Sequence, residues 1–452
     1  MSQSAAMNPS DLPPPLPHQP PLIAAPRKGS GVWVIVFVIA VVVVLLLAVL
    51  AALAIPAYQR VQKMAQEVKN RQAQAVQPPK PLTAEQKQAL KMFGDSLAEA
   101  LTESDDAKVK SLLDSVGLAD RVFDARTSGF PQVGEMRKGF MAGSMKHPGG
   151  WLRNLMGSEI KALRVHERGG FPAVLLRLMP EDGGVNYVDI IARPHGGGFR
   201  ALDMFTYMYA SHLSDETRNL MATMLPDSGA GKLAAWLGAA SFDNEMIDRL
   251  KKGSELMQSG DFAGVLRLCD SLPEKHRAHR MFFMLRMQAL MALNGTEDGK
   301  HDAAYREALR SAPDILGKDS TTDLLLIDLH FLDNNLAEAE ASILRVQKVI
   351  GGDPYLKVLH ANTRRMMKDY EGALKLANEA QQEEPDLYDA VDARLTIRVE
   401  QKNFPALVEE LRSFKRASGV VLDRKSFADD EQFKEFLVSP EFAAREKEIA
   451  AP

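Results

Sequence analysis

The amino-acid sequence predicts a multidomain fold with three parts: a transmembrane helix, an α+β middle domain with an antiparallel sheet, and a C-terminal all-α solenoid of helical repeats. Three observations predict it. A long uncharged apolar run lies near the N-terminus, four short extended segments separated by turns lie in the middle, and a constant spacing recurs between bulky residues near the C-terminus. We divide the 452 residues accordingly into segments 1–30, 31–56, 57–82, 83–225, 226–242, 243–418 and 419–452.

The bulk properties of the chain exclude some functions. With 55 Lys and Arg against 59 Asp and Glu, the chain lacks the basic excess of a dedicated nucleic-acid binder. Cys269 is the only cysteine, so no intrachain disulfide can form. It lies in the apolar stretch GVLRLCDSL, which favours a buried core thiol over a reactive one.

An apolar run at 32–55 predicts an anchor in the lipid bilayer. No charged side chain occurs between Lys28 and Arg60, and a helix of this length spans roughly 36 Å, enough to cross a hydrocarbon core of about 30 Å. A cleaved signal peptide is the alternative, but its apolar region is shorter and starts closer to the N-terminus. We expect the proline-rich residues 1–30 to be disordered, with a ligand for an aromatic groove as the alternative.

The end of the predicted anchor reads LAALAIPAYQRVQKMAQ, with Pro56, Ala57 and Tyr58 in succession. This segment resembles the N-terminal helix of type IV pilins and pseudopilins. The glutamate of that family is missing, because Ile39 stands near its place, so a plain anchor is favoured over a pseudopilin-like secretion component. The likeness implies that the C-terminal domains are exported to a bacterial periplasm. Basic residues within the stalk 57–82 favour the alternative, a cytoplasmic C-terminus.

Segment 83–225 predicts an α+β domain. Helical stretches come first and begin at Thr83, a predicted N-cap with Gln86 in the capping-box position. Four extended runs follow, each bounded by Gly, Pro or Asp turns: IKALRVHE, AVLLRLMP, NYVDIIAR and FRALDMFTYMY. Helices followed by strands with short turns predict an antiparallel meander in an α+β arrangement.

This element order, together with the hairpin YVDIIARPHGGGFRALDMF, resembles the nuclear transport factor two-like (SnoaL-like) cone fold. The resemblance implies a cavity suited to a small ligand or to a catalytic Asp–His pair. The polar residues nearest such a role are Tyr187, Asp189 and Asp203, whereas His195 lies in a Gly-rich turn and is expected to be solvated. Asp189 alternates with apolar residues and is expected to face opposite to them. A packing or partner-binding domain is the alternative, and we favour it over catalysis.

No segment predicts a nucleotide or metal site. The stretch SGAGKL resembles part of a phosphate-binding loop, but Leu233 follows Lys232, and Pro226 stands where the first glycine should be. We therefore assign 226–242 to a linker. The 10 histidines are scattered without the spacing of metal ligands. We predict no catalytic residue, no metal and no cofactor.

From residue 243 onwards the sequence predicts helices in a recurring unit. The fragments GDFAGVL, NNLAEAE, KDYEGAL and KNFPALV place Phe262, Leu336, Tyr370 and Phe404 at equivalent positions. The numbering separates Leu336 from Tyr370, and Tyr370 from Phe404, by 34 residues each. The stretch HDAAYREALRSAPD supplies a further unit, whose helix we expect Pro313 to end. Each unit predicts a helical hairpin with one open apolar face, so neighbouring units must stack.

These features resemble the tetratricopeptide repeat family, with about five units over 243–418 and capping helices over 419–452. Members of that family bind extended or helical peptides in a concave groove lined by the first helix of each unit. The resemblance implies groove positions at Tyr355, Asn362 and Arg365 in one unit and at Asp389, Asp392 and Thr396 in the next. An ordinary solvated helix face is the alternative for each residue. Because Arg365 stands beside two aspartates, we expect a mixed-charge groove.

The sequence therefore favours a membrane-anchored scaffold that binds a protein or peptide partner and is not an enzyme. The first alternative is a small-ligand-binding or enzymatic cone domain with accessory repeats. The second is the pseudopilin-like secretion component.

Overall fold

The structure is a computed structural model that describes residues 81–124, 133–149, 152, 159–180, 184–222, 244–294, 299–317, 321–428 and 430–450. The predicted tail (1–30), membrane anchor (31–56) and linker (226–242) lie outside these residues, as does the predicted stalk (57–82) except for its last two residues, and all four stay predictions. Among the described residues, no helix combines the length and the apolar character needed to span a bilayer. Residues 79–452 form one compact unit.

The described chain begins with a group of helices: α2 (Ala84–Thr102), α3 (Asp106–Leu112), α4 (Ser115–Val122) and α5 (Val133–Ala142). The predicted cap of α2 is confirmed. The Gln86 backbone N–H donates a hydrogen bond to the Thr83 hydroxyl, and the Thr83 N–H donates one to the Gln86 side chain. This capping box satisfies amide groups that a helix N-terminus otherwise leaves without partners.

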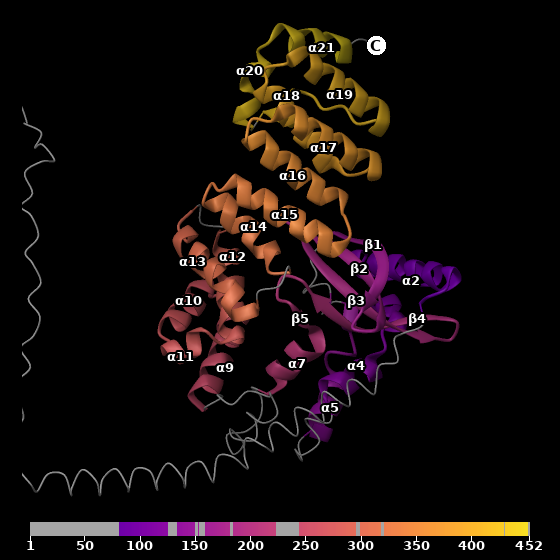
Figure 1. Cartoon of the computed structure of the whole chain (residues 1–452), viewed down its shortest axis with the longest axis vertical. Coiled ribbons are helices and arrows are strands. Elements are labelled where there is room, and N and C mark those ends of the chain that lie inside the picture. Colours follow the sequence, from indigo (N-terminus) through magenta and orange to yellow (C-terminus); the bar gives the residue numbers. More distant parts are fainter. Residues whose placement is uncertain are drawn as a thin grey trace, which may run out of the picture. The chain divides into compact units, whose positions relative to one another are not determined.

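A five-stranded antiparallel sheet follows (Figure 1). Its strands are β1 (Glu159–Arg168), β2 (Phe171–Met179), β3 (Asn186–His195), β4 (Gly198–Thr206) and β5 (Ser211–His212), and their spatial order is their order in the sequence. The predicted meander is therefore confirmed. The last run is shorter than expected, because β4 ends at Thr206 and the chain turns through Ala210, whose φ is 46°. Helix α7 (Leu213–Ala222) comes after β5.

The two faces of the sheet pack against different parts of the chain. Val174 and Leu176 of β2 point to one face and share a hydrophobic cluster with Leu90 and Leu97 of α2. Leu175, between them, points to the opposite face and belongs to a cluster that includes helices much later in the sequence. Figure 1 shows α2 and α15 on different sides of the sheet.

A helical region occupies the rest of the chain. Its first helices are α9 (Asn244–Gln258), α10 (Phe262–Asp270), α11 (Glu274–Arg277), α12 (Arg280–Asn294) and α13 (Asp302–Leu316). They are followed by α14 (Asp323–Leu332), α15 (Leu336–Ile350), α16 (Pro354–Met366), α17 (Tyr370–Glu383), α18 (Tyr388–Glu400) and α19 (Phe404–Ser418). From α12 to α19, each helix contacts the next one along the chain.

The turns that precede four of these helices repeat one backbone geometry. Gly260, Asn334, Lys368 and Lys402 are all left-handed, with φ values of 74°, 52°, 66° and 53°. Each stands two residues before the start of a helix, and these helices begin at the four bulky residues of the sequence pattern: Phe262, Leu336, Tyr370 and Phe404. The sequence pattern therefore marks a turn of constant shape.

One helix extends further than predicted. Pro313 was expected to end its helix but lies inside α13, which continues to Leu316. A proline this close to a helix C-terminus removes only its own N–H from the hydrogen-bond ladder. The helix then ends before Gly317, whose φ is 109°.

The last residues cover the end of the helical region. They form η2 (Arg424–Phe427), η3 (Glu431–Phe433), α20 (Lys434–Leu437) and α21 (Pro440–Ala450). These elements are more apolar on their inner side than their charged sequence suggests. Four phenylalanines join a buried cluster with residues of α18 and α19: Phe427, Phe433, Phe436 and Phe442.

The sheet and the helical region share one hydrophobic core. A single cluster combines Leu175, Tyr187 and Phe205 of the sheet with buried residues of α14, α15 and α16, among them Ile327, Ile343 and Leu356. The sequence pattern changes from strands to helical repeats, so the sequence predicts two separate domains. In the structure the apolar surfaces of the sheet and of the helical region are buried against each other.

Candidate functional site

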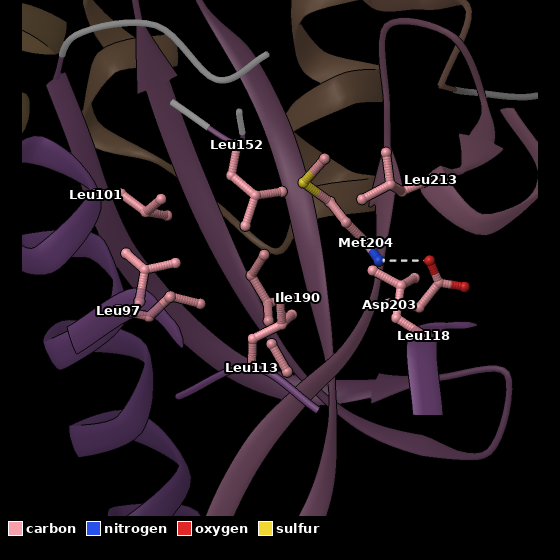
Figure 2. Close-up of a pocket in the computed structure, with 11 residues that line it drawn as sticks. Leu97, Leu101, Leu113, Leu118, Leu152, Ile190, Asp203, Met204 and Leu213 are labelled. Carbon is pink, nitrogen blue, oxygen red and sulfur yellow. Dashed lines mark hydrogen bonds between the residues drawn. The ribbon is translucent and has the colours of Figure 1, made fainter. Parts of the chain in front are cut away.

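A small cavity lies inside the α+β domain, among the residues that the structure describes. It has a volume of about 20 Å³ and is lined almost entirely by apolar side chains. Figure 2 shows Leu97, Leu101 and Ile190 converging on this space. A cavity of this size has room for about one water molecule, whereas small-molecule sites are typically about 300 Å³ or larger.

Asp203 lies at the edge of this cavity, but its carboxylate forms hydrogen bonds and an ion pair with other parts of the fold. Asp203 pairs with Ile191 across the β3–β4 ladder, so its side chain belongs to the face opposite to the cavity. The carboxylate accepts hydrogen bonds from the Met204 N–H at 2.9 Å and from the Ser214 hydroxyl at 2.7 Å, and Arg121 Nε lies 2.8 Å away. Figure 2 draws the bond to the Met204 nitrogen. These contacts hold the start of α7 against the sheet.

Asp189 also lies on the face of the sheet opposite to the cavity, and its side chain points away from those of Val188 and Ile190, as predicted. It is fully buried, and its carboxylate contacts His166 Nε2 at 2.6 Å, the Tyr207 hydroxyl at 3.0 Å and Arg168 Nε. Burial alone would raise the pKa of Asp189, but its contacts with His166 and Arg168 lower that pKa below its usual value. Asp189 is therefore a buried carboxylate whose negative charge is stabilised by neighbouring side chains of the sheet.

Tyr187 belongs to a buried polar cluster between the sheet and the helices, which we call the Arg177 cluster. Arg177, only 1% exposed, donates hydrogen bonds to Asp353 at 2.8 Å and to Glu384 at 2.5 Å. The Tyr187 hydroxyl donates to the other oxygen of Asp353 at 2.6 Å. Lys161 completes the cluster at the surface, 2.7 Å from Glu384.

The Arg177 cluster ties β1, β2 and β3 to the start of α16 and to the end of α17. Asp353 is the N-cap of α16, where it accepts a hydrogen bond from the Tyr355 N–H, and Glu384 follows α17. Burial raises the pKa of Asp353 in spite of Arg177. For Glu384, hydrogen bonds from Arg177 and Lys161 outweigh burial and lower the pKa. The cluster is a clamp between two parts of the fold.

The residues predicted to line a groove lie on two neighbouring helices. Asn362 and Arg365 of α16 are half-buried, Asp389 of α18 is half-buried, and Asp392 is exposed. Tyr355 and Thr396 are each only 7% exposed. Arg177 lies over the Tyr355 ring, 5.9 Å from its centre, so the sheet covers the first of the predicted positions.

The positive charge expected in this groove is neutralised within the chain. The Arg365 guanidinium forms an ion pair with Glu400 of α18. Glu400 also lies 3.4 Å from Lys368 Nζ and accepts a hydrogen bond from the Tyr370 hydroxyl at 3.2 Å. These contacts link the ends of α16 and α18, and they neutralise the charge of Arg365 by an ion pair within the chain.

Asp389 and Asp392 form no direct hydrogen bond or ion pair within the part of the chain that the structure describes. Arg365 lies close enough to Asp392 to favour its charged form, but this effect is smaller than the opposing ones. The protein around Asp392, followed by the negative charges of Asp389 and Asp430, raises the pKa of its carboxyl above the usual value. This surface therefore contains an arginine that is paired with Glu400 and aspartates that have no direct partner among the described residues. We call it the α18 acidic face, defined by Asp389, Asp392 and Asp430.

Sequence reasoning missed the residues that join the two parts of the fold. The sequence could have indicated the role of Arg177, because this residue interrupts the apolar run AVLLRLM of a strand that is buried on both sides. A charged residue at such a place needs a buried partner. Asp353 and Glu384 carried no comparable signal, since each resembles an ordinary residue at a helix end.

No protein-family model matches the chain, and no curated protein or solved structure is significantly similar to it. Among the described residues, no group of three or more His, Cys, Asp or Glu side chains is arranged to hold a metal ion.

Proposed function

We propose that the protein is a membrane-anchored scaffold whose helical region binds a protein partner. The anchor is the apolar run at 32–55. The binding region is a tetratricopeptide-like stack of helical hairpins, and the α+β domain, which we take to be cone-like, supports that stack. The C-terminal domains are exported in this proposal.

The recurring turn supports the repeat architecture. Left-handed backbone falls at Asn334, Lys368 and Lys402, which the numbering separates by 34 residues each. The pairs α14–α15, α16–α17 and α18–α19 contact each other in succession. A row of stacked hairpins buries the apolar face of each pair and leaves one face of its helices free for a partner.

The observation that carries the proposal is the α18 acidic face. Charged side chains that serve only solubility are usually interspersed with the opposite sign. Here Asp389 stands close enough to Asp392 to raise the pKa of its carboxyl, while the nearby Arg365 forms an ion pair with Glu400. A surface that keeps like charges together fits a partner that brings the opposite charge.

The small interior cavity favours a supporting role for the α+β domain. Among the described residues this cavity has a volume of about 20 Å³, which is too small for a substrate, and the carboxylate of Asp203 at its edge is hydrogen-bonded within the fold. We therefore propose no second, enzymatic function.

Charge reversal tests the proposal. Partners that co-purify with the detergent-solubilised full chain are compared for the wild type and the double variant Asp389→Lys/Asp392→Lys. Glu371→Lys, at an exposed residue of α17, is the matched control. We expect the double variant to lose a partner that the control retains, by about tenfold or more in affinity. If all three chains retain the same set of proteins, the proposed binding face is wrong.

A further inference from the structure

A second cavity lies in the first part of the helical region, away from the α18 acidic face. We call it the α10–α13 pocket. It has a volume of about 300 Å³, and its lining comes from α10, α11, α12 and α13 and the residues between α10 and α12. Helix α12 contacts both α10 and α13, and all three helices contribute side chains to the floor. The pocket is open to solvent on one side and belongs to no site described above.

The floor of the pocket is apolar. Cys269, Phe282, Phe283 and Ala308 line it, and each is less than about a tenth exposed. The Cys269 thiol lies 3.9 Å from the Phe282 carbonyl, and burial raises its pKa to about 11. A floor of this kind binds an apolar group because it removes that group from water without burying any unsatisfied polar atom.

The rim of the pocket carries charges of both signs, and two of its carboxylates form no ion pair among the described residues. Arg286 lies 2.5 Å from Asp270, and Arg277 donates a hydrogen bond to the Leu272 carbonyl at 2.8 Å. Glu274 and Glu307 are exposed and have no ion pair among the described residues. A group that enters the pocket therefore meets these two carboxylates at its mouth, while Arg277 is directed to a backbone carbonyl.

We propose that the α10–α13 pocket anchors one large apolar side chain of a partner protein, presented on a segment with Lys or Arg beside that side chain. A volume of about 300 Å³ accommodates a Leu, Met or Phe side chain. Interface hot spots commonly consist of such an anchor in a desolvated pocket, surrounded by polar contacts at the rim. The basic neighbour pairs with Glu307 or Glu274, which fixes the direction of the segment.

The only cysteine of the chain is a reporter for this pocket. The rate at which methyl methanethiosulfonate modifies Cys269 in the full chain is measured by mass spectrometry, with Cys269→Ser as the check on the modified site. The probe is a short helix-forming peptide with one Leu flanked by Lys on the same face. We expect saturating peptide to slow the modification severalfold, because the Leu side chain covers the thiol.

Three comparisons decide the result. Protection should disappear when Ser replaces the Leu of the peptide, and it should weaken when Glu replaces the Lys of the peptide. With the original peptide, protection should also weaken in the Glu307→Lys chain but not in the Glu371→Lys chain. The proposal is overturned if the Leu–Lys peptide gives no protection. It is also overturned if the peptide that carries Glu in place of Lys protects equally well. Equal protection by N-acetyl-leucine amide would show a small-molecule pocket and would overturn it too.

Discussion

Arg177 shows how a single buried charge is stabilised in this fold. Its guanidinium is held by two carboxylates from the helical region, and one of these, Asp353, also accepts the Tyr187 hydroxyl. The transfer of a guanidinium out of water costs several kcal/mol, which only close partners with good geometry can offset. Removal of the arginine alone would leave Asp353 buried with too few partners.

We therefore expect Arg177→Met to lower the free energy of unfolding by about 3–5 kcal/mol. Denaturant titration of the solubilised chain measures this loss. Arg193→Met is the control, because the Arg193–Asp114 pair is also an ion pair of the sheet but Arg193 is 54% exposed. It should cost less than about 1 kcal/mol. Equal losses for the two variants would show that the Arg177 cluster is not a clamp.

Asp189 predicts a pH dependence of stability. Its pKa in the folded chain lies below the ordinary value of 3.8, because His166 and Arg168 stabilise its charged form. The stabilisation is therefore fully present above pH 3.8 and is lost as the pH falls through the lower, folded value. Asp189→Asn should be less stable than the wild type at neutral pH, and this difference should shrink in acid. Unfolding measured over a range of pH tests this, and a difference that stays constant would contradict it.

At the scale of single elements, much of the fold follows from local sequence patterns. Extended runs bounded by Gly, Pro or Asp turns predicted the four long strands, and the spacing of Leu336, Tyr370 and Phe404 predicted the starts of three helices. These patterns are local, so one sequence contains them. The burial of Tyr355 under the sheet was not predictable, because it depends on contacts between segments far apart in the chain.

The candidate site was predictable in part for the same reason. The resemblance to tetratricopeptide repeats implied that Asn362 and Arg365 of one helix lie near Asp389 and Asp392 of another, and the structure puts the two helices in contact. The ion pair that neutralises Arg365 comes from Glu400, at the far end of the neighbouring helix. Its effect on the charge of the surface required the three-dimensional arrangement.

The recurring turn predicts opposite effects of glycine and non-glycine residues at equivalent positions. Gly260 has a φ of 74° and Lys402 a φ of 53°, so both are left-handed. Gly260→Ala should lower the free energy of unfolding by about 1–2 kcal/mol. Lys402→Gly relieves the same strain but makes the unfolded chain more flexible, so we expect a gain of about 0.5–1 kcal/mol. Thermal unfolding measures both, and changes of the same sign would contradict a shared turn geometry.

At the scale of the whole described chain, the common core makes the sheet and the helices depend on each other. Leu175 and Tyr187 share a cluster with Ile343 and Leu356, and the Arg177 cluster lies beside it. Neither surface could be exposed without leaving a large apolar area in water. The helical region is therefore held to a rigid support, which limits the change of shape when a partner binds.

This arrangement predicts that the sheet and helices α14–α16 unfold together. Hydrogen exchange should give amides of β3 and of α16 the same opening free energy, and Arg177→Met should lower both equally. Separate opening of the sheet, with the helices still protected, would show two independent domains.

Cross-linking in living cells tests most directly whether the helical region binds a partner through the α18 acidic face. A photoreactive amino acid is introduced in place of Asp392, and in a second chain in place of Glu371. We predict that the chain labelled at position 392 forms a defined cross-linked product with another protein upon illumination, and that the chain labelled at position 371 does not. Identical products from both positions, or none from position 392, would contradict binding at this face.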